Sequence, residues 1–186
     1  MELNGERIIP APIERTWAAL NDPEVLKACI AGCEQFEPAG DNAYAALLAV
    51  RVGPVNARFK GNVRLSDIVP PTSYTIAFDG QGGVAGFGKG SAQVTLAAEG
   101  AAQTKLGYRV QAQVGGKIAQ VGSRLVDAAA AKVAGEFFDA FEARLRSEGA
   151  GEAAPPPALP AARALPAWLW LVGGAVVLLL LYLLMR

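Results

Sequence analysis

The side chains that most often carry enzyme chemistry are sparse in this sequence of 186 residues, which contains no histidine. Histidine is the commonest general base near neutral pH and the commonest metal ligand in proteins. Ser–His–Asp and Cys–His catalysis are therefore excluded within this chain. Glu14, Asp22 and Glu24 crowd one short stretch, where helix capping and solvation account for them. No pair of carboxylates stands in a catalytic frame, so we predict no catalytic residues and no enzyme activity.

Cys29 and Cys33 are the other candidates for metal or redox chemistry. Their spacing of four would allow them to share one face of a helix. Two thiolates without a further cysteine or any histidine are too few for a structural zinc or iron–sulfur site, so no metal site is predicted. We interpret each cysteine as a small buried hydrophobic residue. A regulatory thiol pair is the alternative.

A glycine-rich segment, FDGQGGVAGFGKG, holds six glycines in the 13 residues 78–90. A phosphate-binding loop of this kind would continue into a helix that begins with Lys and Ser or Thr. A strand pattern follows here instead, so no nucleotide site is predicted. We expect a flexible flap over the mouth of a binding site, and an ordinary glycine-rich hairpin is the alternative.

The charges of residues 1–147 balance, with 15 Lys and Arg against 15 Asp and Glu. Such a segment has no electrostatic footprint for DNA or RNA, so no nucleic-acid partner is expected. Arg58, Lys60 and Arg64 alternate along one strand pattern and form a basic stripe. A solvated strand face is the simpler interpretation of this stripe, and contact with an acidic partner is the alternative.

The elements that must position these residues follow from hydrophobic periodicity. Alternation predicts strands at 2–10, 56–67, 73–79, 88–99 and 104–114; helices are expected at 11–22 and 22–30, and a loop and turn at 31–42. A helix of about 30 residues is expected within 115–149, ending at Gly149. Clean alternation indicates an antiparallel sheet with one solvated face, and the long helix must cover the other. This predicts an α+β, helix-grip (START-like) fold, with a curved antiparallel sheet around a long C-terminal helix.

The C-terminal region differs in composition from the rest of the chain. Residues 167–185 are 19 consecutive apolar or aromatic residues, enough for a helix of roughly 28 Å, which matches a bilayer core. Trp168, Trp170 and Tyr182 lie near its ends, where aromatic belts form. The sequence thus predicts a domain at 1–147, a Pro/Ala-rich linker at 148–166 that acts as an extended tether, and a transmembrane helix at 167–185.

The expected location follows from the two ends of the sequence. The opening MELNGERIIPAP carries charges and lacks the apolar core of a secretory signal. We therefore expect a single-pass C-terminal anchor, with the domain on the cytoplasmic face of the inner (cell) membrane.

Four segments carry a specific family resemblance: TWAALNDPEVLKACIAGCE, GPVNARFKGNVRLSDIVPP, GFGKGSAQVTL and GGKIAQVGSRLVDAAAAKVAGEFF. Together they resemble the carbon monoxide dehydrogenase G-subunit (CoxG) family almost continuously over residues 1–146. The resemblance implies an accessory protein of CO dehydrogenase or a related molybdenum hydroxylase. It also implies a respiratory quinone, menaquinone or ubiquinone, as ligand, no tightly bound cofactor, and linkage of the enzyme to the membrane quinone pool. A ligand-free adaptor that recruits the dehydrogenase to the membrane is the alternative.

Small residues on facing surfaces raise the question of a cavity. Gly61, Gly90, Ala92 and Ala112 fall on the inner side of the strands, and the helix carries Gly122, Ala128–Ala131, Ala134 and Gly135. They indicate either a close approach of helix and sheet or an unfilled volume, and the START-like resemblance favours the cavity. An apolar cavity accepts apolar guests. The candidate ligand-binding residues are Phe59, Tyr74, Phe78, Phe87, Leu125 and Phe137, although an ordinary core is the simpler interpretation of each.

Overall fold

The computed structural model describes residues 1–152, which form one compact unit. The predicted transmembrane helix at 167–185 and most of the predicted linker lie outside the described residues. Within residues 1–152, no helix combines the length and the apolarity that crossing a bilayer requires.

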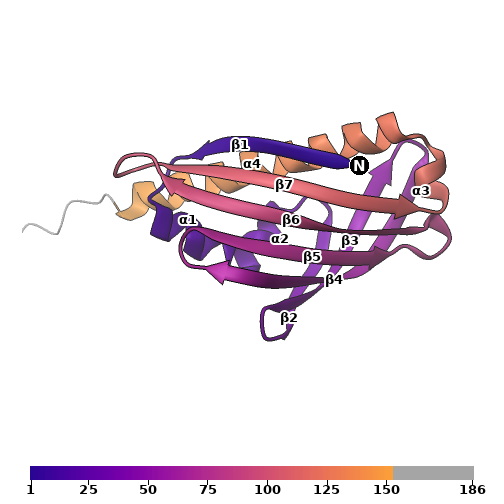
Figure 1. The fold of residues 1–186 in the computed structure, drawn as a ribbon, viewed down its shortest axis with the longest axis horizontal. Helices are drawn as coiled ribbons and strands as arrows, with labels where there is room; N and C mark the ends of the chain where they lie inside the picture. The colour runs from indigo at the N-terminus through magenta and orange to yellow at the C-terminus, as the bar shows by residue number, and fades with distance from the viewer. Residues whose placement is uncertain (153–186) are drawn as a thin grey trace, which may run out of the picture. The chain divides into compact units, whose positions relative to one another are not determined.

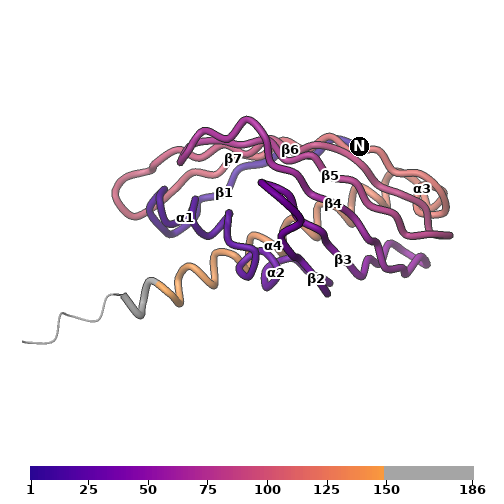
Figure 2. Tube along the Cα trace, turned by 90° about the horizontal axis from the view of Figure 1, so that it is seen from below, coloured from indigo at the N-terminus to yellow at the C-terminus, as the bar shows by residue number. Residues whose placement is uncertain are grey.

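Seven antiparallel strands form a single sheet in the order β1-β7-β6-β5-β4-β3-β2 (Figure 1). Their bounds are β1 Glu2–Ile9, β2 Cys33–Gly40, β3 Ala43–Val52, β4 Val55–Val69, β5 Ser73–Gln81, β6 Phe87–Ala98 and β7 Thr104–Gly115. The first strand therefore pairs with the last, and every other neighbour is consecutive in the chain. The predicted antiparallel sheet is confirmed, and the sheet arches over the helices (Figure 2).

The prediction of a loop and turn at 31–42 is wrong, because residues 33–40 form strand β2. β2 is an edge strand that pairs with β3 with two register shifts, and Phe36 is its one buried side chain. Pro38 and Gly40 are unfavourable in strands, and a single buried residue leaves no alternation to detect. β3, which the sequence analysis also missed, is rich in alanine, and this weakens the contrast between its two faces.

Two short helices follow β1, as expected: α1 Ile13–Leu20 and α2 Pro23–Cys29. The Asp22 side chain caps α2 and accepts hydrogen bonds from the backbone N–H groups of Glu24 at 2.9 Å and Val25 at 3.4 Å. Pro23 occupies the first position of the helix, where its missing N–H costs nothing. Both helices lie on the concave side of the sheet, beneath the arch (Figure 2).

The C-terminal helical region is two helices instead of the expected one: α3 Lys117–Gln120 and α4 Ser123–Glu152. Gly122 separates them with a φ of 98°, a left-handed conformation that favours glycine and breaks a right-handed helix. The expected end at Gly149 is also wrong, because α4 continues to Glu152. A glycine inside a helix costs only about 1 kcal/mol and does not oblige it to stop.

The hydrophobic core between sheet and helices is divided into two clusters. The larger cluster joins α1, α2, the C-terminal half of α4 and the sheet, and its most deeply buried side chains are Ile9, Leu106, Phe141 and Leu145. The smaller cluster lies around α3 and the start of α4 and contains Val52, Phe59, Ala85, Ile118 and Val126. α4 is thus held against the sheet near both ends by separate sets of contacts.

A small buried hydrogen-bond network ties α1 to β7. Thr16 and Thr104 are both fully buried, and the Thr104 hydroxyl donates to the carbonyl of Ala11 at 2.8 Å. The Thr16 hydroxyl lies 3.3 Å from the Thr104 hydroxyl and 3.4 Å from the same carbonyl. Because Ala11 precedes the first helix, this network fixes the angle at which the chain leaves β1.

Replacing Thr104 by valine is expected to lower the free energy of unfolding by about 1–3 kcal/mol, because the Ala11 carbonyl loses its best donor in a buried place. Urea denaturation of the full chain measures this loss. Thr95→Val is the matched control, since the Thr95 hydroxyl is exposed and only 3.4 Å from the Gly107 carbonyl. An equal loss in both variants would contradict a special role for the buried network.

Candidate ligand-binding site

A row of small residues crosses the inner face of the sheet between the two core clusters. The register pairs Gly61 with Gly80 between β4 and β5, and Gly90 with Ala112 between β6 and β7. Ala92 lies one step along β6 on the same face, between Ile76 and Val110. The side chain of each of these residues is a single methyl group or a hydrogen atom, so few side-chain atoms project from the sheet at the centre of its inner face.

The inner face is accessible to solvent at its centre. Val63, Ile76, Phe78 and Val110 point toward the helices from central strands, yet each remains partly exposed. Above them, α4 has no buried side chain between Val126 and Phe138. The middle turns of the helix are therefore less deeply buried against the sheet than its two ends. The small residues of the strands therefore lie on a part of the inner face that stays partly exposed.

Phe78 defines the floor of this interior. It pairs with Gly90, and a Cβ at Gly90 would collide with the Phe78 ring and with the carbonyl of Gln111. Glycine at position 90 thus lets the ring lie flat across the neighbouring strand. Phe78 is half-buried and presents an aromatic surface to the accessible space.

The other predicted site residues are distributed between the two clusters. Tyr74 and Phe137 belong to the larger cluster and Phe59 to the smaller one. Phe87 and Leu125 are exposed, at 45% and 50%, near the end of the domain where α3 lies. The structure therefore brings Phe78 to the centre of the inner face and places Tyr74, Phe137 and Phe59 toward its two ends, with Phe87 and Leu125 on the outside.

Tyr74 is the most polar of the buried candidates. Its side chain is 4% exposed, and its ring meets Trp17 of α1 edge-on, with centroids 5.5 Å apart. Burial raises the pKa of Tyr74 far above its usual value, and the nearby Tyr44 phenol adds to this effect. The hydroxyl is therefore a proton donor at any physiological pH. It makes no hydrogen bond to another described residue.

Two residues near this site escaped the sequence analysis. Trp17 lies on α1, whose apolar face is expected to fill the core, so periodicity gives it no special role. Tyr44 stacks on Phe36 with ring centroids 5.0 Å apart, and both residues come from the strands that were not predicted. A buried aromatic with a polar tip is the signal that could have singled them out.

The glycine-rich segment forms the ordinary hairpin that the sequence allowed as an alternative. Gly83–Ala85 is a single 3₁₀ turn, η1, between β5 and β6, and the Gly82 N–H donates to the Gly86 carbonyl at 2.8 Å. Ala85 is buried in the smaller cluster. Gly86 has a φ of 115°, and a Cβ there would collide with the Gly115 carbonyl. Ala85 and Gly86 are therefore packed against the rest of the domain, whereas Val84 at the tip is exposed.

The two cysteines lie at an element boundary, with Cys29 ending α2 and Cys33 beginning β2. Cys29 is buried in the larger cluster, as predicted, whereas Cys33 is partly exposed. Burial raises the pKa of both thiols, which leaves little thiolate at neutral pH. Nothing in this arrangement activates either cysteine for redox chemistry.

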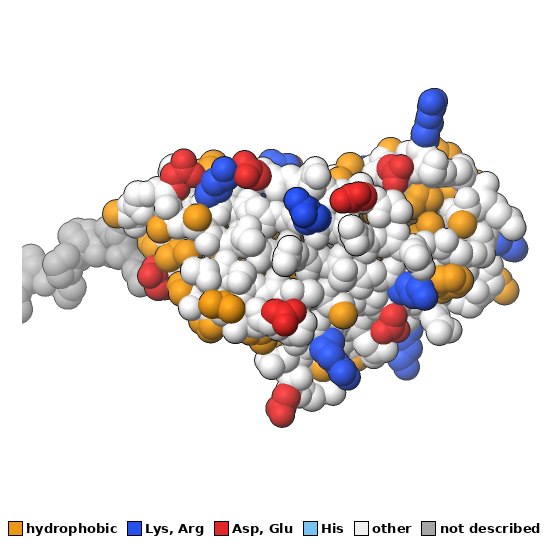
Figure 3. All heavy atoms as spheres, in the orientation of Figure 1, with side chains coloured by type: hydrophobic (Ala, Val, Ile, Leu, Met, Phe, Trp, Pro, Cys, Tyr) orange, Lys and Arg blue, Asp and Glu red, His pale blue; other side chains and the backbone are white. Residues whose placement is uncertain are grey.

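The outer face of the sheet is polar and its charges are scattered (Figure 3). A shallow open hollow in the described domain includes the inner-face residues Phe78, Gly90 and Ala112, and its lining also contains Met1, Glu2, Lys89, Ser91, Gln111 and Gln113. In the basic stripe, Arg58 is already paired with Glu34 at 2.8 Å, which agrees with a solvated strand face.

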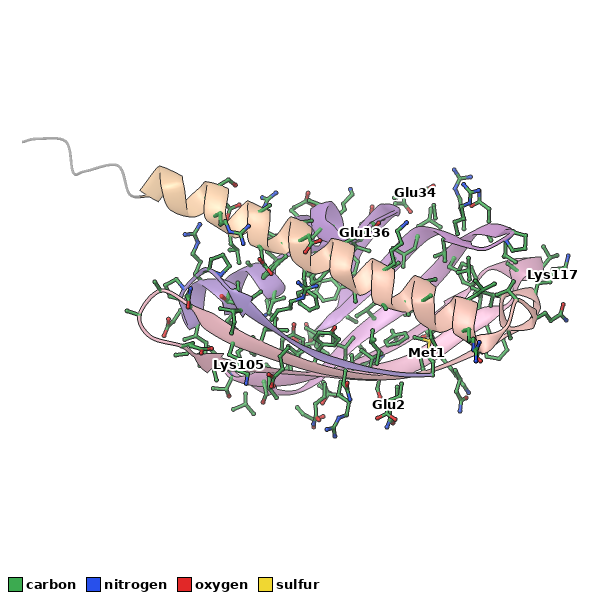
Figure 4. All side chains as sticks on the ribbon, turned by 90° about the horizontal axis from the view of Figure 1, so that it is seen from above. Met1, Glu2, Glu34, Lys105, Lys117 and Glu136 are labelled. Atoms are coloured by element: carbon green, nitrogen blue, oxygen red, sulfur yellow. The ribbon has the colours of Figure 1, made fainter. Side chains whose placement is uncertain are left out.

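β7 runs along the long axis of the domain, with Lys105 near the helices α1 and α2 and the following Lys117 at the opposite end (Figure 4). The larger cluster, with Tyr74 and Trp17, lies at the Lys105 end, and the smaller cluster lies at the Lys117 end. The accessible centre of the inner face lies between them. A ligand in this interior would therefore extend along the strands and have an aromatic group at each end.

Comparison with known proteins supplies a family and a fold. Residues 5–146 match the family model for the G subunit of carbon monoxide dehydrogenase (CoxG). Among curated proteins, none matches the chain with statistical significance.

Solved structures share the fold over most of their length. A conserved protein from Geobacillus kaustophilus is 29% identical, with a TM-score of 0.76 over 80% of this chain and 97% of its own. A protein from Thermus thermophilus is 18% identical, with a TM-score of 0.61 over 80% of this chain and 99% of its own. The ZhuI aromatase/cyclase from Streptomyces sp. R1128 is 14% identical, with a TM-score of 0.58 over 80% of this chain and 95% of its own. The last two show the START-like fold alone.

Proposed function

The chain belongs to the carbon monoxide dehydrogenase CoxG family, and on that premise we propose that it is a membrane-anchored, non-enzymatic accessory protein that holds a respiratory quinone for a molybdenum hydroxylase. The family indicates the accessory role beside carbon monoxide dehydrogenase. The quinone, menaquinone or ubiquinone, occupies the interior between α4 and the sheet. It links the enzyme to the quinone pool of the membrane.

One observation carries the ligand part of this proposal: the inner face of the sheet is apolar and accessible at its centre. Ile76, Phe78 and Val110 keep part of their surface exposed there, beneath a helix stretch without buried side chains. Burying apolar surface of a guest contributes about 25 cal/mol per Å². A guest that covers a few hundred Å² would therefore gain several kcal/mol from this interior.

The membrane part of the proposal rests on residues 167–185, the apolar stretch with aromatic residues near its ends. It supplies the anchor, and residues 148–166 supply the tether, so that the domain stays at the cytoplasmic face of the inner membrane. The protein itself contributes no redox group. It contributes placement and exclusion of water, while the hydroxylase delivers the electrons that reduce the quinone.

The decisive experiment is lipid extraction of the full-length protein purified from membranes, followed by mass spectrometry of the extract. We expect a respiratory quinone at a substantial fraction of the protein concentration. An unrelated protein washed through the same detergent and matched in concentration gives the background. Recovery of no quinone above that background would favour the ligand-free adaptor, which docks the dehydrogenase to the membrane without a guest.

An enzyme of the cyclase kind is the remaining alternative, because one of the structural neighbours is an aromatase/cyclase. At 14% identity that likeness carries the fold and no activity. The absence of histidine from the sequence and the apolar side chains of the interior argue for binding. Measurable turnover of a polyketide by the purified protein would overturn the non-enzymatic assignment.

A further inference from the structure

We propose that Tyr74 is the polar anchor of the ligand site, where its hydroxyl donates a hydrogen bond to a neutral carbonyl oxygen of an aromatic or quinoid guest. This inference rests on the proposed function, because it assumes that the interior holds a ligand. Beyond the proposed function, it specifies at which end of the interior the ligand oxygen lies and which chemical group the protein recognises.

The first argument is that the Tyr74 hydroxyl lacks a partner. The side chain is 4% exposed, and neither a backbone group nor a side chain of residues 1–152 forms a hydrogen bond with it. Buried polar groups in proteins are nearly always hydrogen-bonded, because an unmade bond leaves the cost of desolvation uncompensated. The hydroxyl is not among the fully enclosed side-chain atoms without a hydrogen bond in the described domain, so part of its surface is accessible. A guest in the interior is the missing partner.

The second argument concerns charge. The residues packed around Tyr74 in the larger cluster are apolar, among them Trp17, Leu65 and Val94. Two cations reach the edge of this cluster, Arg7 over the Phe138 ring and Arg144 near Cys29, and each is already paired with a carboxylate, Asp139 and Glu148 respectively. A further carboxylate beside Tyr74 would be an isolated buried charge, which is very costly. A phenol that stays protonated donates to an acceptor and cannot neutralise an anion. The site therefore favours a neutral carbonyl over the carboxylate of a fatty acid.

The third argument is the aromatic setting. Trp17 meets the Tyr74 ring edge-on, at an interplanar angle of 79°. The rings of Trp17 and Tyr74 offer edges and faces to a planar guest, which favours a ring ketone or quinone among neutral carbonyl compounds.

The test compares two probes of the same shape on the full-length protein in detergent. The probes are 2-methyl-1,4-naphthoquinone and 2-methylnaphthalene, which lacks both carbonyl oxygens, and titration calorimetry gives each dissociation constant. In Tyr74→Phe we expect affinity for the quinone to fall about 5- to 10-fold, the range of one hydrogen bond. Affinity for the hydrocarbon should not change.

Tyr108→Phe is the matched control, since Tyr108 is a half-buried tyrosine of the same cluster whose ring stacks on Phe138 at 5.1 Å. It should bind both probes as the wild type does. The midpoint of thermal unfolding without ligand adds a readout of structural role. Tyr74→Phe should unfold at the same temperature as the wild type or higher, because it removes an unpartnered polar group.

The outcomes separate the anchor from the site. An unchanged quinone affinity in Tyr74→Phe, or an equal loss for both probes, would contradict the role of Tyr74 as the anchor. Either result would remain consistent with an apolar ligand site. A lower unfolding midpoint without ligand would show that the hydroxyl has a structural partner, and this also overturns the anchor. If the wild type binds neither probe, the proposed function fails and the anchor fails with it.

Discussion

Replacement of Ala92 by phenylalanine is expected to weaken ligand binding strongly while the domain keeps its fold. Ala92 lies on the inner face of β6 between Ile76 and Val110, where the surface is accessible and the side chains are small. A phenyl ring at this position occupies the space that the ligand needs. Blocking about 100 Å² of apolar contact removes about 2.5 kcal/mol, which is about a 60-fold loss of affinity. Calorimetric titration with 2-methyl-1,4-naphthoquinone measures this loss.

The matched control for this variant is Ser91→Phe. Ser91 is the preceding residue on the same strand, but its side chain is exposed on the outer face. The Ser91→Phe substitution adds the same ring on the opposite side of the sheet, so the quinone affinity should equal that of the wild type within experimental error. Overpacking costs about 1–3 kcal/mol in a filled core. A strongly destabilised Ala92→Phe protein would therefore show that the interior is solid, against the proposed site.

Phe141→Ala is expected to have the largest effect on stability. Phe141 is fully buried in the larger cluster and stacks on Phe137 with centroids 5.7 Å apart. Removing a buried phenylalanine side chain costs about 3–5 kcal/mol, because transfer energy is lost and a cavity remains. Domains of this size have about 5–15 kcal/mol of stability in total. Chemical denaturation of the full chain, followed by circular dichroism, gives the loss directly.

The control for Phe141→Ala is Phe87→Ala, at a position that is 45% exposed. Its expected loss is much smaller, about 1 kcal/mol or less. Equal losses at the two positions would mean that the larger cluster does not hold α4 to the sheet. Phe141 follows Phe138 by one helical turn, so this test reports on the C-terminal contact of α4 and not on its middle turns.

The parts of the fold that could be predicted from the sequence are those with strong periodicity. Strands β4 to β7 alternate between polar and apolar residues, and Asp22–Pro23 is a clear start of a helix. β2 and β3 were missed because a single buried phenylalanine in one and a run of alanines in the other leave no contrast between faces. The break at Gly122 depends on a φ of 98°. Composition alone does not distinguish this glycine from one that a helix tolerates.

The candidate site was predicted less completely, for a related reason. Alternation tells which face a side chain belongs to, but not how far along the domain it lies or how deeply it is buried. Phe78 and Phe87 both belong to the glycine-rich segment, yet one faces the interior and the other is exposed. Whether the Tyr74 hydroxyl has a hydrogen-bond partner depends on all the groups that surround it in the fold. A local sequence pattern cannot predict this. The membrane helix at 167–185 stays a prediction from composition.

Trp17, the single tryptophan of the described domain, meets the ring of Tyr74 at 5.5 Å and so lies beside the proposed anchor. Quinones quench the fluorescence of a nearby indole, so the fluorescence of Trp17 should decrease when a quinone binds in the interior and recover when the quinone dissociates. With Trp168 and Trp170 changed to phenylalanine, the protein would report its own loading optically, without any attached dye. The exchange of its guest with a vesicle could then be timed in a stopped-flow instrument.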